Sequence, residues 1–221
     1  MITNQIGRRT YRSGRQSRTV VGMVRPFRQQ IDEGILDRAA ALFARRGFAK
    51  TSVQQVADAV GLSKAGLLHH FPSKDALHEA VLAQAGTLGR RLLDQVRDLP
   101  PSATRDRRVV EVMVDLALAR PGLVALLLSS ATALDAASNG PELEATSALV
   151  FEAFGADPAE CEPERLIRIT GTMAALGVLT LAAHQAGETT AWRQHIVATC
   201  FDALGHRSPG AALPDSDQVE A

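Results

Sequence analysis

The sequence predicts an all-α protein with about nine helices. Apolar residues recur at helical spacing along most of the 221-residue chain, and no segment shows the two-residue alternation of a strand. Aromatic residues make up only 4% of the chain, so Ala, Leu and Val must fill the core, a set that suits helices. Gly, Pro, Ser and Thr punctuate the periodic segments, as expected of helix ends.

Each predicted helix has a start or stop signal. Hydroxyl side chains that can cap a helix precede the second, third and fourth segments, glycine ends the first two, and Pro100-Pro101 ends the fourth. The first four helices are expected at 28–46, from Thr51 to Gly61, from Ser63 to His70, and from Ser73 to about 100. Five more are expected at 103–119, 121–135, 141–155, 163–186 and 189–204.

The charge is divided between the two parts of the chain. Residues 1–80 carry 13 Lys and Arg against 6 Asp and Glu, a net charge of +7, whereas residues 81–221 carry 11 against 18, a net charge of −7. A basic N-terminal part favours contact with nucleic acid there, and a chance asymmetry of solvated faces is the alternative.

Four regions are expected. Residues 1–27 contain six arginines and no acid, which predicts a flexible basic arm; alternatively, Met23 is the true start. Residues 28–89 form a domain with a helix-turn-helix at 52–71, because two short helices flank a tight turn at Gly61-Leu62. Residues 90–206 form a helical bundle, and 207–221 a disordered tail.

Several classes of function are disfavoured. Cys161 and Cys200 have no metal-ligand spacing, and no catalytic constellation or phosphate loop is visible, so no enzyme, cofactor or metal site is predicted. The most apolar run, 169–183, is short for a membrane span, and the arginine-rich N-terminus is no signal peptide. A cytoplasmic, bacterial, nucleoid-associated protein without a membrane partner is therefore expected.

A helix that enters the major groove explains the glycine in the third helix. Gly66 weakens a short helix by about 1 kcal/mol relative to alanine. With Ala65, it leaves little between the backbone and a groove floor, which allows close approach.

The motifs of this region, taken in order, resemble the DNA-binding domain of TetR-type transcriptional repressors over about residues 29–89. They are Phe43, Gly47-Phe48, Thr51-Ser52, Val56-Ala57, Gly61-Leu62-Ser63, His70-Phe71 and Ser73-Lys74-Asp75-Ala76-Leu77. One departure stands out: Leu68 takes the place of the family's usual Tyr, so a phenolic phosphate contact is missing, and Leu68 would touch a thymine methyl or pack.

The residues and the resemblance together predict a DNA-contacting set. Helix N-termini can hold phosphates, and the tip of a recognition helix can reach base edges. The candidates are Thr51, Ser52, Gln54, Ser63, Lys64, Ala65, Gly66, Leu68, His69, His70 and Lys74.

Some members of this set have a second interpretation. Thr51, Ser52 and Gln54 could simply cap the second helix, and Lys64 could be solvated. His70 could pack at the end of its helix, whereas His69, about 100° around the helix, would face DNA. Lys74 lies where a helix N-terminus disfavours a cation, which favours a phosphate partner.

The second half is expected to dimerise and to bind an effector, as the resemblance implies. The helix at 163–186 is rich in small residues and apolar on more than one face, so with the last helix it could form a four-helix interface; a central core helix is the alternative. The candidate interface residues are Gly171, Ala174, Ala175, Val178, Trp192 and Ile196. An apolar cavity could be lined by Met113, Leu116, Leu126, Leu127 and Phe151, which would favour a hydrophobic small-molecule effector, or these residues could be tightly packed core.

The function expected from the sequence is therefore a homodimeric, ligand-responsive repressor that binds a palindromic operator in double-stranded DNA. The alternative is a helix-turn-helix protein without a small-molecule effector, controlled by a protein partner or acting constitutively.

Overall fold

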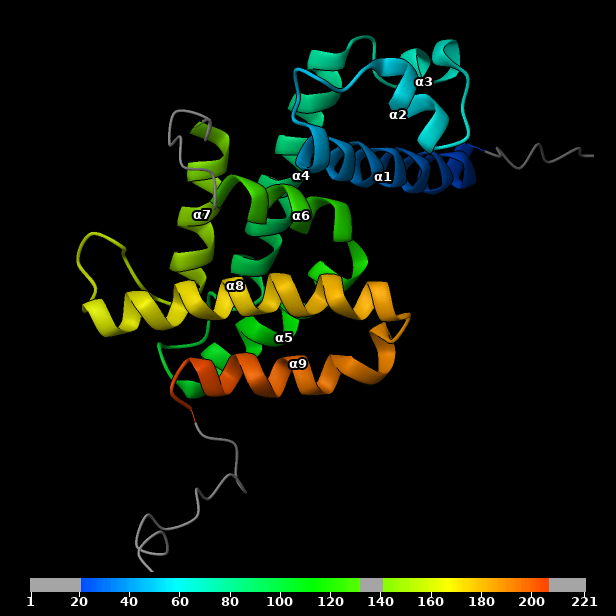
Figure 1. Cartoon of the computed structure of the whole chain (residues 1–221). Coiled ribbons are helices and arrows are strands. Elements are labelled where there is room, and N and C mark those ends of the chain that lie inside the picture. The colour runs from blue at the N-terminus through cyan, green and yellow to red at the C-terminus, as the bar shows by residue number, and fades with distance from the viewer. Residues whose placement is uncertain (1–20, 132–140, 207–221) are drawn as a thin grey trace, which may run out of the picture.

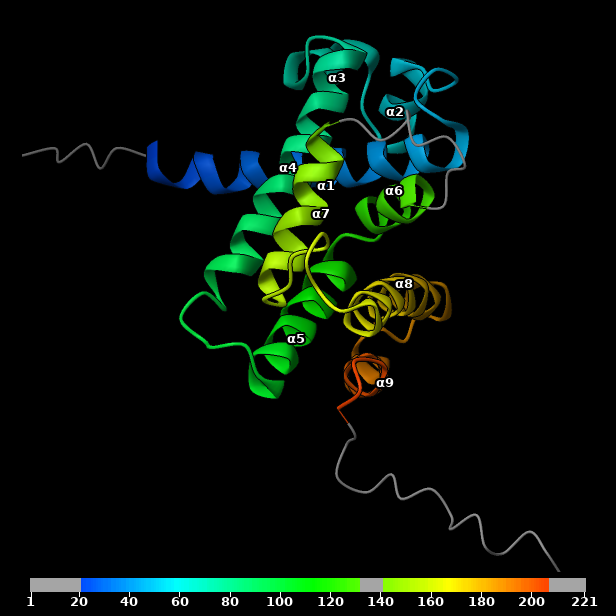
Figure 2. The same ribbon diagram turned by 90° about the vertical axis from the view of Figure 1, so that its left-hand side faces the viewer.

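The nine predicted helices are present in the computed structural model, which describes residues 21–131 and 141–206. These residues contain no strand. Two layers are visible in Figures 1 and 2: α1 to α4 gather at one end of the molecule, and α8 and α9 run side by side at the other. The helices are α1 (Val21–Arg46), α2 (Val53–Ala59), α3 (Lys64–His70), α4 (Lys74–Asp94), α5 (Ala103–Ala119), α6 (Pro121–Ala131), α7 (Pro141–Ala153), α8 (Pro163–Ala186) and α9 (Thr189–Ala203).

Local signals placed most helix ends correctly. Gly47 and Gly61 adopt positive φ values of 77° and 71°, as the predicted glycine stops require. Ser63 and Ser73 cap α3 and α4, because each hydroxyl accepts a hydrogen bond at 3.0 Å from the backbone N–H three residues on. The predicted bounds of α5 and α8 are confirmed.

Two predicted ends are wrong. The first helix begins at Val21, so residues 21–27 belong to α1 and not to a flexible arm; residues 1–20 and the tail from 207 lie outside the described residues. The fourth helix ends at Asp94, well before Pro100, because Gln95 and Val96 donate three-residue turn bonds to Leu92 and Leu93. The predicted extension of the sixth helix to 135 also falls outside the described residues.

Two apolar cores hold the helices together. One lies within the bundle of α5, α7, α8 and α9 and includes the fully buried Phe154 and Ile169. The other joins α1 to α4 and also takes in Leu123 and Leu126 of α6. Because α6 packs on α1, it connects the N-terminal helices to the bundle (Figure 1).

The helix α8 is strongly apolar, although most of it is not buried within the protein. By length and composition alone it could cross a membrane, with a mean hydropathy of 1.7 in its most apolar window, but only 33% of that window is buried. One such helix is weak support for a membrane span, because core helices have the same composition. Here α8 packs along α9, α5 and α6, and the apolar side it leaves exposed needs another explanation.

Candidate nucleic-acid interface

Helices α2 and α3 form a rigid helix-turn-helix on the N-terminal core. Val56 and Leu67 are buried at 0% and 1% exposure, one from each helix. The turn is closed by the N–H of Leu62, which donates a 2.9 Å hydrogen bond to the carbonyl of Ala57. Gly61 supplies the left-handed conformation that this turn needs. The turn therefore holds α3 at a defined angle to α2.

The start of α2 differs by one residue from the predicted capping box. Ser52 is the cap: its Oγ accepts from the N–H of Gln55 at 3.2 Å, and its own N–H donates to Gln55 Oε1 at 2.9 Å. Thr51 is only 2% exposed and donates its hydroxyl to the carbonyl of Gly47 at 2.9 Å. The side chain of Thr51 is thus a structural anchor and is removed from the DNA-contacting set.

The outer face of α3 is open to solvent. Ser63, Lys64, Ala65 and His69 are exposed, and Leu68 is half-buried. A Cβ added at Gly66 would meet only Ser63 Oγ at 3.3 Å and Leu62 Cβ at 3.8 Å, so a small shift within the free protein would accommodate alanine. The contacts within the free protein therefore give little reason for a glycine at this position.

Three other candidates make contacts within the protein. Lys74 Nζ donates to the carbonyl of Phe48 at 3.0 Å and lies 4.2 Å from the centre of its ring. His70 Nδ1 lies 2.6 Å from Asp32 Oδ1, which ties the last turn of α3 to α1. Gln54 Nε2 donates to Asp58 Oδ1 at 2.7 Å on the exposed side of α2, so it does not cap Thr51.

The partners that hold these side chains could not be predicted from the sequence. Asp32 is 38 residues from His70, and Phe48 is 26 residues from Lys74, so the pairs appear only when the helices are packed. Lys50, exposed two residues before the cap of α2, adds a cation to this surface that the motif analysis passed over.

Residues 35–81 match the family model described as bacterial regulatory proteins, tetR family. The chain carries a TetR-type helix-turn-helix domain. The match covers α2 and α3 entirely, with the second half of α1 and the start of α4.

Curated relatives match over parts of their length. The transcriptional repressor KstR2 of Rhodococcus jostii is 38% identical over 80 residues, 36% of this chain and 38% of that protein. The transcriptional regulator RutR of Escherichia coli is 46% identical over 52 residues, 24% of each chain. The nucleoid occlusion factor SlmA of Pasteurella multocida is 28% identical over 112 residues, 50% of this chain and 54% of that protein. The matches thus span about a quarter to a half of each relative, and two of these three relatives are named as transcriptional regulators.

Solved structures share the fold over most of the chain. A candidate fatty acid metabolism regulator of Clostridium perfringens superposes with a TM-score of 0.54 at 14% identity, over 76% of this chain and 97% of that one. RHA5900, which is named as a transcriptional regulatory protein, superposes with a TM-score of 0.50 at 22% identity, over 83% and 100%. These likenesses confirm the predicted all-α fold class.

The predicted effector residues do not gather around one cavity. Leu126 and Leu127 belong to the core of the TetR-type domain, whereas Met113, Leu116 and Phe151 pack in the core of the bundle. The alternative that they are packed core therefore describes them better.

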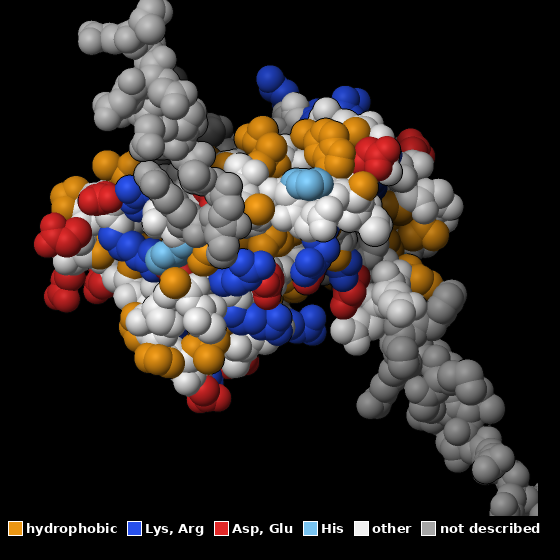
Figure 3. Space-filling view, turned by 90° about the horizontal axis from the view of Figure 1, so that it is seen from below, with side chains coloured by type: hydrophobic (Ala, Val, Ile, Leu, Met, Phe, Trp, Pro, Cys, Tyr) orange, Lys and Arg blue, Asp and Glu red, His pale blue; other side chains and the backbone are white. Residues whose placement is uncertain are grey.

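The predicted dimer residues fall into two groups. Gly171, Ala174 and Val178 lie on one exposed side of α8, and Trp192 is 37% exposed on α9. Ala175 is half-buried, and Ile196 is only 2% exposed, so Ile196 is a core residue and is removed from the proposed interface. In Figure 3, which views the molecule from the end where α9 lies, apolar side chains are visible at the surface among charged ones.

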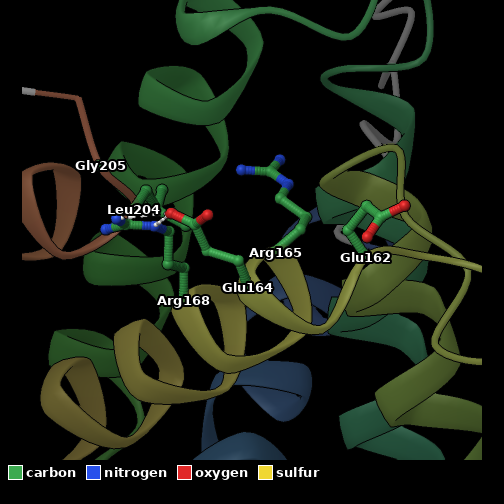
Figure 4. Close-up of a pocket in the computed structure, with 6 residues that line it drawn as sticks. All are labelled: Glu162, Glu164, Arg165, Arg168, Leu204 and Gly205. Carbon is green, nitrogen blue, oxygen red and sulfur yellow. Dashed lines mark hydrogen bonds and ion pairs between the residues drawn. The ribbon is translucent and has the colours of Figure 1, made fainter.

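A cavity of about 320 Å³ near the start of α8 contains four charged side chains, but those of its two arginines are already paired. Figure 4 shows Arg168 beside Glu164 and Arg165 pointing away from both. Arg165 instead holds Asp106 through two 2.8 Å hydrogen bonds. Both arginines of this cavity are therefore paired, and none of its polar side-chain atoms is buried without a partner.

The thiols and titratable groups of the described residues form no reactive centre. No group of three or more metal-ligating side chains occurs among these residues. Cys200 is buried, and burial raises the pKa of its thiol to about 11, which makes it a poor nucleophile.

Proposed function

We propose that the protein is a DNA-binding transcriptional regulator that acts as a homodimeric repressor on a palindromic operator. The observation that carries the proposal is the exposed face of α3, which presents Lys64, Ala65 and His69 on a helix-turn-helix that matches the tetR family model. Lys64 is the leading residue for a test, because it is exposed at the first position of α3 and has no partner among the described residues.

The test is a salt titration of DNA binding with the Lys64→Ala variant. Each lysine that neutralises a phosphate steepens the dependence of log affinity on log salt by about one, so a dimer should lose about two from its slope. The DNA flanking the protein's own gene is compared with random DNA. Arg97→Ala is the control, because Arg97 is an exposed cation just beyond the end of α4 that pairs with Asp94. Equal slopes for both variants and the wild type would contradict the proposal.

Dimerisation through α8 and α9 is supported by the apolar surface that these helices expose. Ile167 and Val178 are 70% and 60% exposed, and Gly171 and Ala174 lie between them at spacings of four, three and four residues. Residues at such spacings share one helix face. Together with the 37% exposed Trp192, they make a surface that a second copy would remove from water.

The oligomeric state tests this interface directly. Val178→Arg places a charge on the proposed surface without touching the core, and should give a monomer in sedimentation or light scattering at micromolar concentration. Ala148→Arg, at an exposed position of α7, is the matched control and should leave the mass unchanged. A wild type that is monomeric at about 100 μM would overturn the proposal.

A second candidate is a DNA-binding protein controlled by a partner protein, or acting constitutively, without a small-molecule effector. The match to a nucleoid occlusion factor, which covers more of this chain than the matches to the two regulators, favours it. Binding at one operator near the gene supports the repressor, whereas binding at many sites across the genome supports this alternative.

A further inference from the structure

A groove of about 310 Å³ lies where α1, α4 and the start of α6 meet. Its walls are four residues of α1, six of α4 and Arg120. This size is at the lower end of small-molecule sites. The groove joins the TetR-type domain to the helix that leads into the bundle, and these three helices can be found together in Figure 1.

Two polar atoms of this groove are buried without a partner. They are Gln84 Oε1 and Arg120 Nε, the two side-chain atoms in the described residues with this property. The other nitrogens of Arg120 are used, because Nη1 donates to the carbonyl of Ala119 and Nη2 pairs with Glu33. An unsatisfied buried acceptor and an unsatisfied buried donor in one groove call for a molecule that supplies both partners.

One cation of the groove offers a partner for an anionic group. Glu33 is neutralised by Arg120, and Asp32 lies against His70. Arg91, in contrast, makes no hydrogen bond or ion pair within the part of the chain that the structure describes. Arg91 is therefore a guanidinium of the groove without a protein partner, and a guanidinium binds carboxylates through two parallel hydrogen bonds.

We propose that this groove binds a small organic carboxylate that has an apolar body and a hydroxyl or amide N–H donor. The carboxylate would accept from Arg91 and from Arg120 Nε, and the donor would reach Gln84 Oε1. The apolar body would lie on Leu36 and Leu88, which line the groove between the polar groups. This assignment replaces the hydrophobic effector expected from the sequence.

The groove has a direct connection to α3. Asp32, one of the lining residues, is the partner of His70 in the last turn of α3. A ligand that holds α1 and α4 at a different spacing would change this contact and so the orientation of α3, provided that it binds the two arrangements with different affinity. This step rests on the proposed function, whereas binding in the groove does not.

Thermal stabilisation tests the groove. The probes are 4-hydroxybutyrate, 4-hydroxybenzoate, 4-hydroxyphenylacetate and N-acetylleucine at 10 mM, each compared with the acid that lacks the donor or the amide that lacks the charge. At ten times its dissociation constant a bound probe should raise the melting temperature by about 3–6 °C. Arg91→Ala and Gln84→Leu should each weaken binding roughly tenfold, while the control Arg97→Ala binds as the wild type does.

The outcomes separate the groove from the proposed function. If no probe raises the melting temperature, or if Arg91→Ala and Arg97→Ala respond alike, the groove proposal is wrong. If a probe binds through Arg91 and lowers the affinity for DNA, both the site and its connection to α3 are supported. If a probe binds but the protein binds no DNA specifically, the groove stands and the repressor proposal fails.

Discussion

Replacing Gly122 with alanine should destabilise the protein by forcing α6 away from α1. A Cβ at Gly122 would lie 1.9 Å from the carbonyl oxygen of Asp37 and 2.8 Å from its carbon, both backbone atoms that cannot rotate aside. An ordinary contact needs about 3.4 Å or more, so the two helices must separate by more than an ångström. That movement also stretches the 3.0 Å hydrogen bond from the N–H of Leu123 to Asp37 Oδ1, which caps α6.

The magnitude follows from these two losses. Overpacking costs about 1–3 kcal/mol and a lost cap about 1 kcal/mol, so Gly122→Ala should lower the free energy of unfolding by about 2–4 kcal/mol. For a chain of this size the melting temperature should fall by roughly 4–16 °C. Calorimetry or urea unfolding measures the change.

Gly34→Ala is the control that makes the experiment decisive. Gly34 is an exposed glycine inside α1, and a Cβ there would meet nothing within 4 Å. Alanine should therefore stabilise the protein by about 0.5–1 kcal/mol, through the higher helix propensity of alanine. Equal effects of the two substitutions would refute the claim that α1 and α6 touch through their backbones.

Three further perturbations test single contacts. Arg105→Met should cost about 3 kcal/mol or more in urea unfolding, because the buried guanidinium of Arg105 donates to the carbonyls of Leu99, Glu152 and Ala153 at 2.7–2.9 Å. Burial lowers the pKa of His78 below 6.5, against the raising effect of nearby carboxylates. The free energy of unfolding should therefore decline as the pH falls below 6.5, because the unfolded chain takes up this proton more readily. His78→Phe should flatten that decline in melting curves. Gln84→Leu removes a buried unpaired oxygen and should stabilise the ligand-free protein by about 1 kcal/mol; a loss of stability would show that the oxygen is satisfied.

Local chemistry determined much of what the sequence could predict. The caps at Ser63 and Ser73 and the glycine turns at Gly47 and Gly61 depend only on side chains within a few residues. The choice between Thr51 and Ser52 as the cap of α2 was not decidable in this way, since both residues can cap. In the folded chain, the hydroxyl of Thr51 donates to the carbonyl of Gly47 and is buried, so Ser52 is the residue that caps α2.

The candidate ligand site could not be predicted because its residues are distant in the sequence. Gln84 and Arg120 are ordinary surface residue types, and their unpaired atoms become visible only when α1, α4 and α6 are packed. The residues predicted to line an effector cavity were chosen because ligand cavities have apolar linings. In the structure these residues are divided between the two apolar cores, so they do not line one cavity.

Three acids of α1 contact the groove, α6 and α3. Glu33 pairs with Arg120, and Asp37 caps α6 at Leu123, while Asp32 holds His70 of α3. Because α1 is one continuous helix, these contacts join α6 and α3 through a single element. Asp32→Asn should therefore weaken the coupling: a probe should still raise the melting temperature, but it should lower the affinity for DNA by a smaller factor than in the wild type. Unchanged coupling, measured as the ratio of DNA affinities with and without the probe, would mean that α4 alone transmits the signal.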